Sequence, residues 1–318
     1  FHNYLKRYFN ARLAFNSGMV LLFSLFYYYS RKIMPDTFSI ALIFIGIWGF
    51  DQFLIKRNWS FFVLAFVSIF FGVASKLPAV VSMVFLWPLF KTAKLRDQML
   101  ITAGLIATAL FSGWWYFSWV PHLEKTFGYT HFFMGDGMMS SFKFLINQWP
   151  NTLRMVFIKP LGVTGILLLI PGFYFAFKNK LDIILITLGS LFLFILFMLN
   201  SGDRFGEHEY YVIPIIPFFA FLVGLTLNQL KGWIYMLLLS AICIDGVARK
   251  WEDQFIKNDA GLLSLEQTIA PLIPQESLIA INSGKFPTPM YFAHRKGWVT
   301  SNKNLQDNAY LHSLKRKG

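Results

Sequence analysis

The residues best suited to chemistry lie in one short stretch of this chain, Asp203-Arg-Phe-Gly-Glu-His-Glu-Tyr-Tyr211. The stretch lies between two long apolar runs, 181–199 and 210–228. Charges are costly to hold in hydrocarbon, so such a cluster is expected at the water boundary of a membrane. Its cations suit a phosphate, and its carboxylates suit sugar hydroxyls or general-base catalysis. The stretch therefore predicts a polar site on one membrane face.

The composition indicates a membrane protein. The 318 residues are 56% hydrophobic and only 14% charged, whereas a soluble domain carries about 25% charged residues. Each apolar run is predicted to be a helix, because a lipid-exposed backbone must satisfy its own hydrogen bonds. We expect an α-helical polytopic membrane protein with about nine spans, at residues 13–29, 37–55, 59–74, 77–90, 98–120, 160–177, 181–199, 210–228 and 232–247.

The net charge and the single cysteine limit the classes of function that fit this chain. The net charge of +13 does not indicate nucleic acid, because Lys and Arg collect in the loops of membrane proteins for topological reasons. The single cysteine, Cys243, lies inside an apolar run and is expected to be a packing residue. No cofactor is evident. A divalent metal is compatible with the outer carboxylates and His208, but no spacing demands one.

The polarity of the chain changes after the last apolar run. Residues 1–247 form the predicted membrane core, and residues 248–318 have ordinary polarity. In this second segment a helical pattern covers 260–273, and strand-like stretches follow at 278–281, 290–293 and 297–300. We therefore expect a small α/β domain.

The orientation follows from the loops, because basic residues favour the cytoplasmic side. Strict alternation from a cytoplasmic loop at 91–96 keeps most loop cations on that side, namely Lys6, Arg7, Arg12, Lys56, Arg57, Lys91, Lys94, Arg96, Lys178, Lys180 and Lys231. The stretch 203–211 and the C-terminal segment then lie outside the cytoplasm. The long outer loop 121–159 contains an amphipathic helical pattern at Met138–Trp149, which suits either a brace in the interface or a lid over a cavity.

Three outer loops bring polar residues towards one face. The first holds Arg31, Lys32 and Asp36, the second holds Lys76, and the third holds the stretch 203–211. Lys76 is the most informative because it interrupts apolar sequence between two runs. A purely structural role is the alternative to a functional one for several of these residues. Arg31 and Lys32 suit interface anchors, Asp36 suits a helix cap, and Tyr210 and Tyr211 suit an aromatic belt.

At these positions the chain resembles the membrane glycosyltransferases of the GT-C fold, in the branch of the aminoarabinose transferases and the protein O-mannosyltransferase-like proteins. The run Glu207-His-Glu-Tyr-Tyr-Val-Ile-Pro-Ile-Ile-Pro217 is similar to a span start of that family. Further similar motifs are Ala11-Arg-Leu13, Met34-Pro-Asp-Thr37, Gly72-Val-Ala-Ser-Lys-Leu-Pro78 and Pro289-Met-Tyr-Phe-Ala-His-Arg-Lys-Gly-Trp298.

The resemblance implies transfer of a sugar from a polyprenyl-phosphate donor to a lipid, glycan or protein acceptor, with inversion, at the outer face of a cell membrane such as a bacterial inner membrane. The leaving lipid phosphate needs preorganised positive charge. We expect the donor phosphate to contact Lys76, Arg204, His208, Tyr210 and Tyr211. Substrate contacts are expected from Arg31, Asp36, Asp203, Glu207 and Glu209.

The resemblance also implies that the chain is a fragment, without the family's first span and first outer loop. The sequence ends at Leu314-Lys-Arg-Lys-Gly318 without a structural stop, so we expect the C-terminal domain to be truncated as well. The carboxylate base of the family lies in that first loop. We therefore expect the base outside this chain, with Asp36 as a weaker candidate, and an inactive fragment.

Two other classes of function compete with a glycosyltransferase. A transporter or flippase for lipid-linked or polar substrates would also gather charges in a membrane cavity, but near the bilayer midplane on broken helices. A receptor that binds its ligand with the C-terminal segment would leave Lys76 and the stretch 203–211 without a role.

Overall fold

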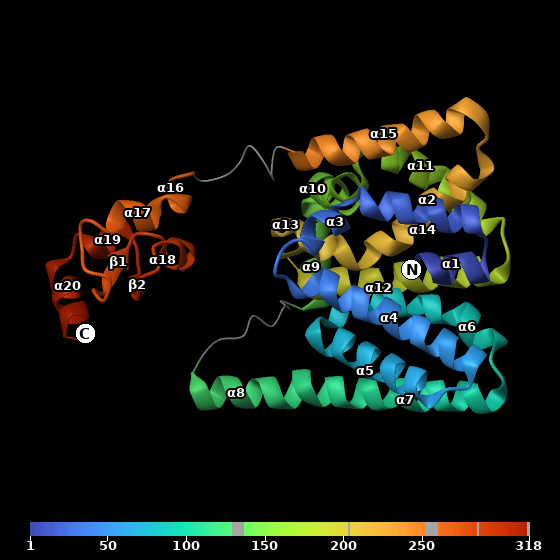
Figure 1. Cartoon of the computed structure of the whole chain (residues 1–318), viewed down its shortest axis with the longest axis horizontal. Coiled ribbons are helices and arrows are strands. Elements are labelled where there is room, and N and C mark those ends of the chain that lie inside the picture. The colour runs from blue at the N-terminus through green and yellow to red at the C-terminus, as the bar shows by residue number, and fades with distance from the viewer. Residues whose placement is uncertain (129–136, 203, 252–259, 285, 317–318) are drawn as a thin grey trace. The chain divides into compact units, whose positions relative to one another are not determined.

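The computed structural model describes residues 1–128, 137–202, 204–251, 260–284 and 286–316, and only the backbone of residues 204, 207 and 260. The chain divides into two compact units, Phe1–Lys250 and Trp251–Gly318 (Figure 1). The first unit is built from helices alone in its described part, and the second holds a small sheet.

Among the described residues, six helical segments of the first unit are long and apolar enough to cross a membrane: Pro35–Lys56, Leu95–Phe127, Trp149–Phe177, Leu181–Ser201, Glu209–Gln229 and Gly232–Trp251. The predicted runs 59–74 and 77–90 correspond to the shorter apolar helices Trp59–Ser75 and Leu77–Thr92. The predicted run 13–29 is instead divided into the helices Ala11–Leu22 and Leu25–Ser30, because Ser24 caps the start of a new helix. The prediction of a helical polytopic membrane protein is confirmed.

The helices of this unit are, in chain order, α1 (His2–Tyr8), α2 (Ala11–Leu22), α3 (Leu25–Ser30), α4 (Pro35–Lys56), α5 (Trp59–Ser75), η1 (Leu77–Leu86), α6 (Trp87–Thr92), α7 (Leu95–Trp114), η2 (Trp115–Trp119), α8 (Val120–Phe127), α9 (Met138–Asn147), α10 (Trp149–Leu153), η3 (Arg154–Ile158), α11 (Lys159–Phe177), α12 (Leu181–Ser201), α13 (Arg204–Glu207), η4 (Glu209–Ile215), α14 (Ile216–Gln229) and α15 (Gly232–Trp251). Here η1 and η4 are 3₁₀-helices, while η2 and η3 are π-helical turns. The amphipathic stretch predicted at Met138–Trp149 is helical in α9 and the start of α10.

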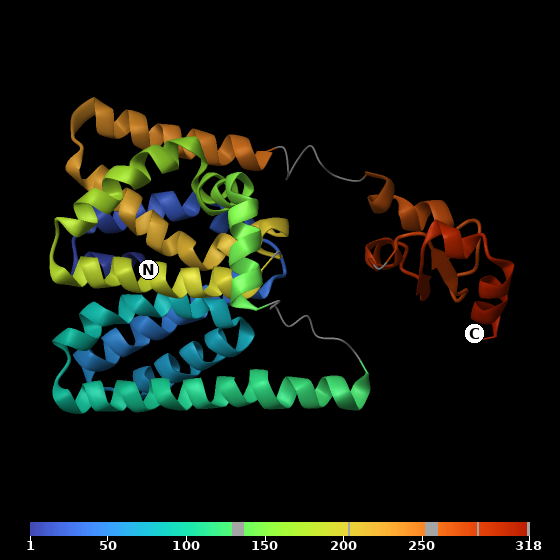
Figure 2. The ribbon, with the colours of Figure 1, turned by 180° about the vertical axis from the view of Figure 1, so that it is seen from behind.

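Successive long segments run in opposite directions, so the chain reversals gather at two ends of the unit (Figures 1 and 2). We call the end that holds the reversals at 31–34, 76 and 202–208 the site end. The opposite end holds the reversals at 57–58, 93–94 and 178–180. There, ion pairs join cations at helix ends to helix carboxylates: Arg7–Asp51 at 3.0 Å, Arg57–Asp97 at 2.6 Å and Lys91–Asp182 at 3.0 Å.

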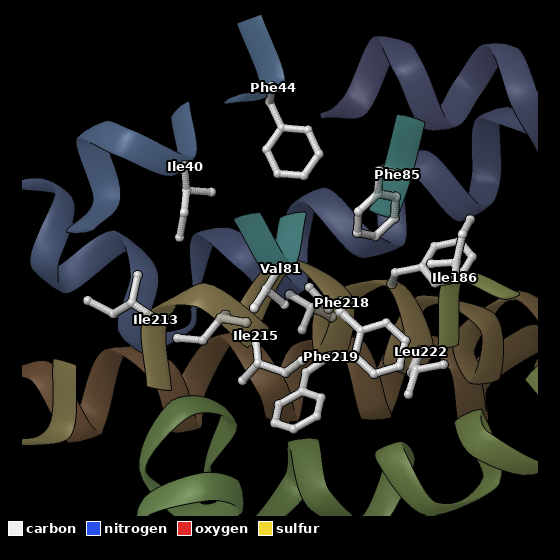
Figure 3. Close-up of a cluster of buried hydrophobic side chains, with 14 of the residues drawn as sticks. Ile40, Phe44, Val81, Phe85, Ile186, Ile213, Ile215, Phe218, Phe219 and Leu222 are labelled. Carbon is white, nitrogen blue, oxygen red and sulfur yellow. The ribbon is translucent and has the colours of Figure 1, made fainter. Parts of the chain in front are cut away.

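The segment Glu209–Gln229, formed by η4 and α14, is the centre of the unit, with 94% of its span window buried. It packs against α2 and α11. In the core, Ile213, Ile215 and Phe219 of this segment lie with Val81 of η1 and Ile40 of α4 (Figure 3). The two 3₁₀-helices and the start of α4 thus share one packed layer.

Close packing of small residues joins α4 to α5. Gly49 lies against the backbone of Ala65, and Gly72 lies against the carbonyl of Ser39, so a Cβ on either glycine would approach backbone atoms to 3.1 Å or less. Helices in lipid gain little from hydrophobic burial against one another and depend on such contacts. The pair α4–α5 is therefore a rigid support for the residues at its site end.

The second unit contains α16 (Ala260–Leu263), α17 (Leu265–Ile269), β1 (Ile279–Ile281), α18 (Thr288–Phe292), β2 (Gly297–Val299), α19 (Asn302–Leu305) and α20 (Asn308–Lys315). The strands pair in parallel, with Ile279 opposite Gly297 and Ile281 opposite Val299. Two predictions were wrong in detail. The helix expected over 260–273 is divided at Ser264, and the strand expected at 290–293 is part of α18, because Pro289 in its first turn favours a helix start.

Candidate functional site

Lys76 is placed by an abrupt change of helix type. It is the single residue between the end of α5 and the start of η1, and its backbone is extended (φ −157°, ψ 106°). Its N–H donates to the carbonyl of Gly72 at 3.3 Å, and its own carbonyl accepts from Ala79 at 3.0 Å. Pro78 interrupts the α-helical pattern of α5, since a proline has no backbone N–H to donate to the carbonyl four residues earlier. The backbone of Lys76 is thus hydrogen-bonded to both α5 and η1.

Asp36 is the carboxylate that faces Lys76. Pro35 starts α4 and places Asp36 in the first turn, where the free N–H groups of the helix favour a negative charge. The Asp36 side chain is 1% exposed, and its Oδ1 lies 3.4 Å from Lys76 Nζ. Neither carboxylate oxygen accepts a hydrogen bond from a described residue. The ion pair with Lys76 is therefore the main compensation for this buried charge.

Two tyrosines and a histidine surround the same lysine. Lys76 Nζ lies 5.7 Å from the ring centroids of both Tyr210 and Tyr211. The His208 ring stacks on Tyr210 at 5.0 Å and meets Tyr211 edge-on at 5.6 Å. Cations and aromatic faces attract at such separations. The structure thus brings together Asp36, Lys76, His208, Tyr210 and Tyr211, all of them among the predicted site residues.

Glu209 belongs to a second ion pair beside this cluster. Its Oε2 lies 3.1 Å from Lys159 Nζ, and its Oε1 accepts a hydrogen bond from Tyr29 Oη at 3.0 Å. The ring of Tyr29 also contacts Tyr210, at 6.1 Å between centroids. Because Glu209 and Tyr210 are neighbours in η4, the two lysine–carboxylate pairs form one continuous polar and aromatic surface.

Lys159 and Tyr29 are site residues that the sequence analysis did not propose. Each lies at the boundary of an apolar run, where a lysine is ordinarily a topological charge and a tyrosine an interface anchor. The only available signal was Lys159-Pro160, a cation placed directly before a helix-starting proline. The pairing partners are remote in sequence, and no spacing rule connects them.

The remaining predicted residues have different positions. Arg31 is exposed in the turn after α3. Lys32 lies over the rings of Tyr28 and Tyr29, at 4.0 and 4.7 Å. Asp203 and the side chains of Arg204 and Glu207 fall outside the described residues, and the backbone of the latter two forms α13.

A hollow of about 570 Å³ adjoins the turn after α3. Its walls are mostly apolar and come from α3, the turn at 31–34 and the first turns of α4, with Lys32 as the charged residue; the lining comprises Phe26, Ser30, Lys32, Ile33, Met34, Pro35, Thr37, Phe38 and Ala41. The hollow thus opens beside the helix start that carries Asp36.

Departures from α-helical geometry border this surface. The 3₁₀-helices η1 and η4 begin directly after Lys76 and at Glu209, and the π-helical turn η3 ends directly before Lys159. In η2, Tyr116 donates to the carbonyl of Ala74 at 2.8 Å, next to the end of α5. Such distortions expose backbone groups and are frequent at functional sites. Within the described residues, no three His, Cys, Asp or Glu side chains are grouped as metal ligands.

The bundle thus carries two lysine–carboxylate pairs and a group of stacked aromatic rings at one end. Residues 2–117 match the model of one family, described as dolichyl-phosphate-mannose-protein mannosyltransferase. This match supports the resemblance to membrane glycosyltransferases of the GT-C type over these residues. The matched part contains Tyr29, Asp36 and Lys76. None of the curated proteins and none of the solved structures gives a significant match.

Proposed function

We propose that the protein transfers a sugar from a polyprenyl-phosphate donor to a lipid, glycan or protein acceptor at the site end of the bundle, which faces away from the cytoplasm. In this reaction the bond between the anomeric carbon and the phosphate oxygen breaks, and the acceptor oxygen bonds to the opposite side of that carbon. The polyprenyl phosphate leaves as an anion, and the acceptor proton passes to a base. The stereochemistry at the sugar is inverted.

The observation that carries this proposal is the placement of Lys76 against Asp36, Tyr210 and Tyr211. A leaving phosphate gains negative charge as the glycosidic bond breaks, and a fixed cation stabilises that charge without reorganisation. Lys76 has a side chain that is 22% exposed, so it is both held in place and reachable. His208, half-buried beside it, is a second donor for the phosphate. Arg204, Arg31, Asp203 and Glu207 remain proposed contacts of donor and acceptor.

Asp36 supports Lys76 in this proposal and does not act as the base. A general base must come within hydrogen-bonding distance of the acceptor hydroxyl. With 1% of its side chain exposed, Asp36 is closed to an acceptor, and its negative charge fixes the ammonium group. Glu209 has the same relation to Lys159, although it is more exposed, at 24%.

The orientation of the bundle rests on its loop charges. The opposite end carries the basic loops at 56–57, 91–96 and 178–180, which are expected in the cytoplasm. The site end, and with it the C-terminal unit that follows α15, then faces away from the cytoplasm. Labelling of single cysteines at Arg31 and at Lys94 with a membrane-impermeant reagent tests this orientation in intact cells.

A transporter of lipid-linked or polar substrates is the second candidate. In its favour, the broken helix α11 resembles the discontinuous helices of transporter sites. Against it, Asp36, Lys76 and Glu209 lie at helix ends, where a surface reaction is expected, and not midway along a span.

Transfer from a radiolabelled polyprenyl-phosphate sugar in proteoliposomes distinguishes the two candidates. We expect the wild-type protein to transfer label to an acceptor, and Lys76→Ala and His208→Ala to lose most of this activity. Lys56→Ala is the matched control, because Lys56 lies over the Phe61 ring at 4.7 Å at the opposite end. Near-wild-type transfer by both site variants would overturn the phosphate assignment, and translocation of the lipid without transfer would favour the transporter.

A further inference from the structure

Helix α11 is broken one turn after its first residue. Gly162 has φ 70° and ψ −177°, a conformation open almost only to glycine. A break of this kind disturbs the helical hydrogen bonds that cross it, and backbone groups freed inside a membrane protein must find other partners. Lys159, the first residue of α11 and the partner of Glu209, lies three residues before the break.

The last turns of α15 hold this break. Arg249 Nη1 donates to the carbonyl oxygen of Lys159 at 3.1 Å, and Arg249 Nε pairs with Asp245 Oδ1 at 3.2 Å. The Asp245 carboxylate itself packs on the Cα of Gly162, so closely that a Cβ at this position would overlap Oδ2. The carboxylate orients the guanidinium, and the guanidinium binds the backbone of Lys159.

A second contact joins the same turn of α15 to Glu209. Lys250 lies over the ring of Tyr28 at 4.9 Å, and Tyr28 meets Tyr29 edge-on at 5.1 Å. Tyr29 donates its hydroxyl to Glu209. Two series of contacts therefore connect α15 to the Glu209 carboxylate. One begins at Arg249 and passes through α11, and the other begins at Lys250 and passes through α3.

We propose that Asp245 and Arg249 are positioning residues that fix the broken turn of α11 and thereby hold Lys159 against Glu209. Without this clamp, the turn 159–162 is free to unwind, and the second cation of the site loses its place. The structural part of this inference is independent of the reaction. Its consequence for donor binding rests on the proposed function.

The structural part is tested by cross-linking in the full chain in detergent. The Lys159→Cys, Glu209→Cys double variant, in a Cys243→Ser background, is treated with a short bifunctional methanethiosulfonate reagent. We expect added Arg249→Ala to slow cross-linking about tenfold, as for residues coupled in one network, with a smaller effect from Arg249→Lys. Arg12→Ala is the control, since Arg12 donates to the Leu230 carbonyl and lies over the Tyr235 ring, away from the contacts of the clamp.

Equal cross-linking rates with and without Arg249→Ala would overturn the inference. If Arg249→Ala does not fold, Asp245→Asn gives the same comparison with less disturbance. A second measurement is the affinity for undecaprenyl phosphate, for which Arg249→Ala should weaken binding in the wild type and have no further effect in Lys159→Ala. If the losses of affinity in Arg249→Ala and Lys159→Ala were additive, Arg249 would not act through Lys159, and the inference would be overturned. If the wild-type protein does not bind this probe, the proposed function fails, and cross-linking still decides the clamp.

Discussion

Lys76 Nζ lies 3.4 Å from Asp36 Oδ1, and this ion pair joins the residue directly after α5 to the first turn of α4. Each charge is also favoured by its own helix, because a helix N-terminus attracts anions and a C-terminus attracts cations. The packed glycine contacts between α4 and α5 keep the two ends in register. The pair is therefore part of the architecture as well as part of the candidate site.

Removing Lys76 should destabilise the protein strongly. Lys76→Ala leaves the buried Asp36 carboxylate without compensation, and we expect the free energy of unfolding to fall by about 3–5 kcal/mol. Titration with a denaturing detergent in mixed micelles measures this quantity. The Lys76→Met, Asp36→Leu double variant should recover most of the loss, because paired apolar replacement of a buried ion pair is often neutral.

Lys91→Ala is the matched control for that variant. Lys91 also forms an ion pair, with Asp182 at 3.0 Å, but its side chain is 53% exposed. Exposed pairs contribute only about 0–1 kcal/mol. Equal losses in Lys76→Ala and Lys91→Ala would contradict the burial argument.

The α4–α5 interface should not tolerate a methyl group at Gly46. A Cβ there would overlap Ile69 and approach the Ala65 carbonyl to 2.9 Å. We expect Gly46→Ala to reduce the free energy of unfolding by about 1–3 kcal/mol, as overpacking does elsewhere. Gly113→Ala, in α7 with no atom of another helix within 4 Å of the new methyl group, should be neutral or stabilising. Similar losses in the two variants would refute the packing explanation.

Tyr29→Phe should weaken the second ion pair without removing it. The variant loses a hydrogen bond of 3.0 Å to the Glu209 carboxylate, and hydrogen bonds to charged groups contribute about 1.5–3 kcal/mol. We expect the free energy of unfolding to fall by an amount near the lower limit of this range, since Glu209 keeps its ion pair with Lys159. Tyr27→Phe, at an exposed tyrosine of the same helix, is the control, and thermal unfolding in detergent is the measurement. An unchanged transition in Tyr29→Phe would argue against this contact.

Gly162→Ala should disturb α11 for two reasons that can be separated. An alanine in this backbone conformation costs about 1–3 kcal/mol, and its methyl group also meets Asp245. Adding Asp245→Ala should relieve the second effect and leave the first. Gly18→Ala, whose new methyl group makes only ordinary contact, should have little effect. Full recovery in the double variant would mean that the backbone at residue 162 is not strained.

The sequence predicted the framework because apolar runs reflect the membrane directly. It also identified Lys76, a charge inside apolar sequence, and placed Asp36 and the stretch 203–211 at the same end. The partners of Glu209 could not be predicted, since Tyr29 and Lys159 reach it through packing of α3, α11 and η4. The strand expected at 290–293 failed for a local reason, the proline that starts α18. The π-helical turn η3 was not predicted, because no residue or spacing in the sequence analysis indicated it.

The one-residue reversal at Lys76 has a consequence for the thermodynamics of binding. A lysine on a long loop must surrender backbone freedom each time an anion is captured, and this conformational entropy opposes association. Lys76 has helices directly before and after it, so its main chain loses that freedom once, when the bundle folds. When an anion binds at this end, the conformational entropy that Lys76 loses is therefore that of its side chain alone.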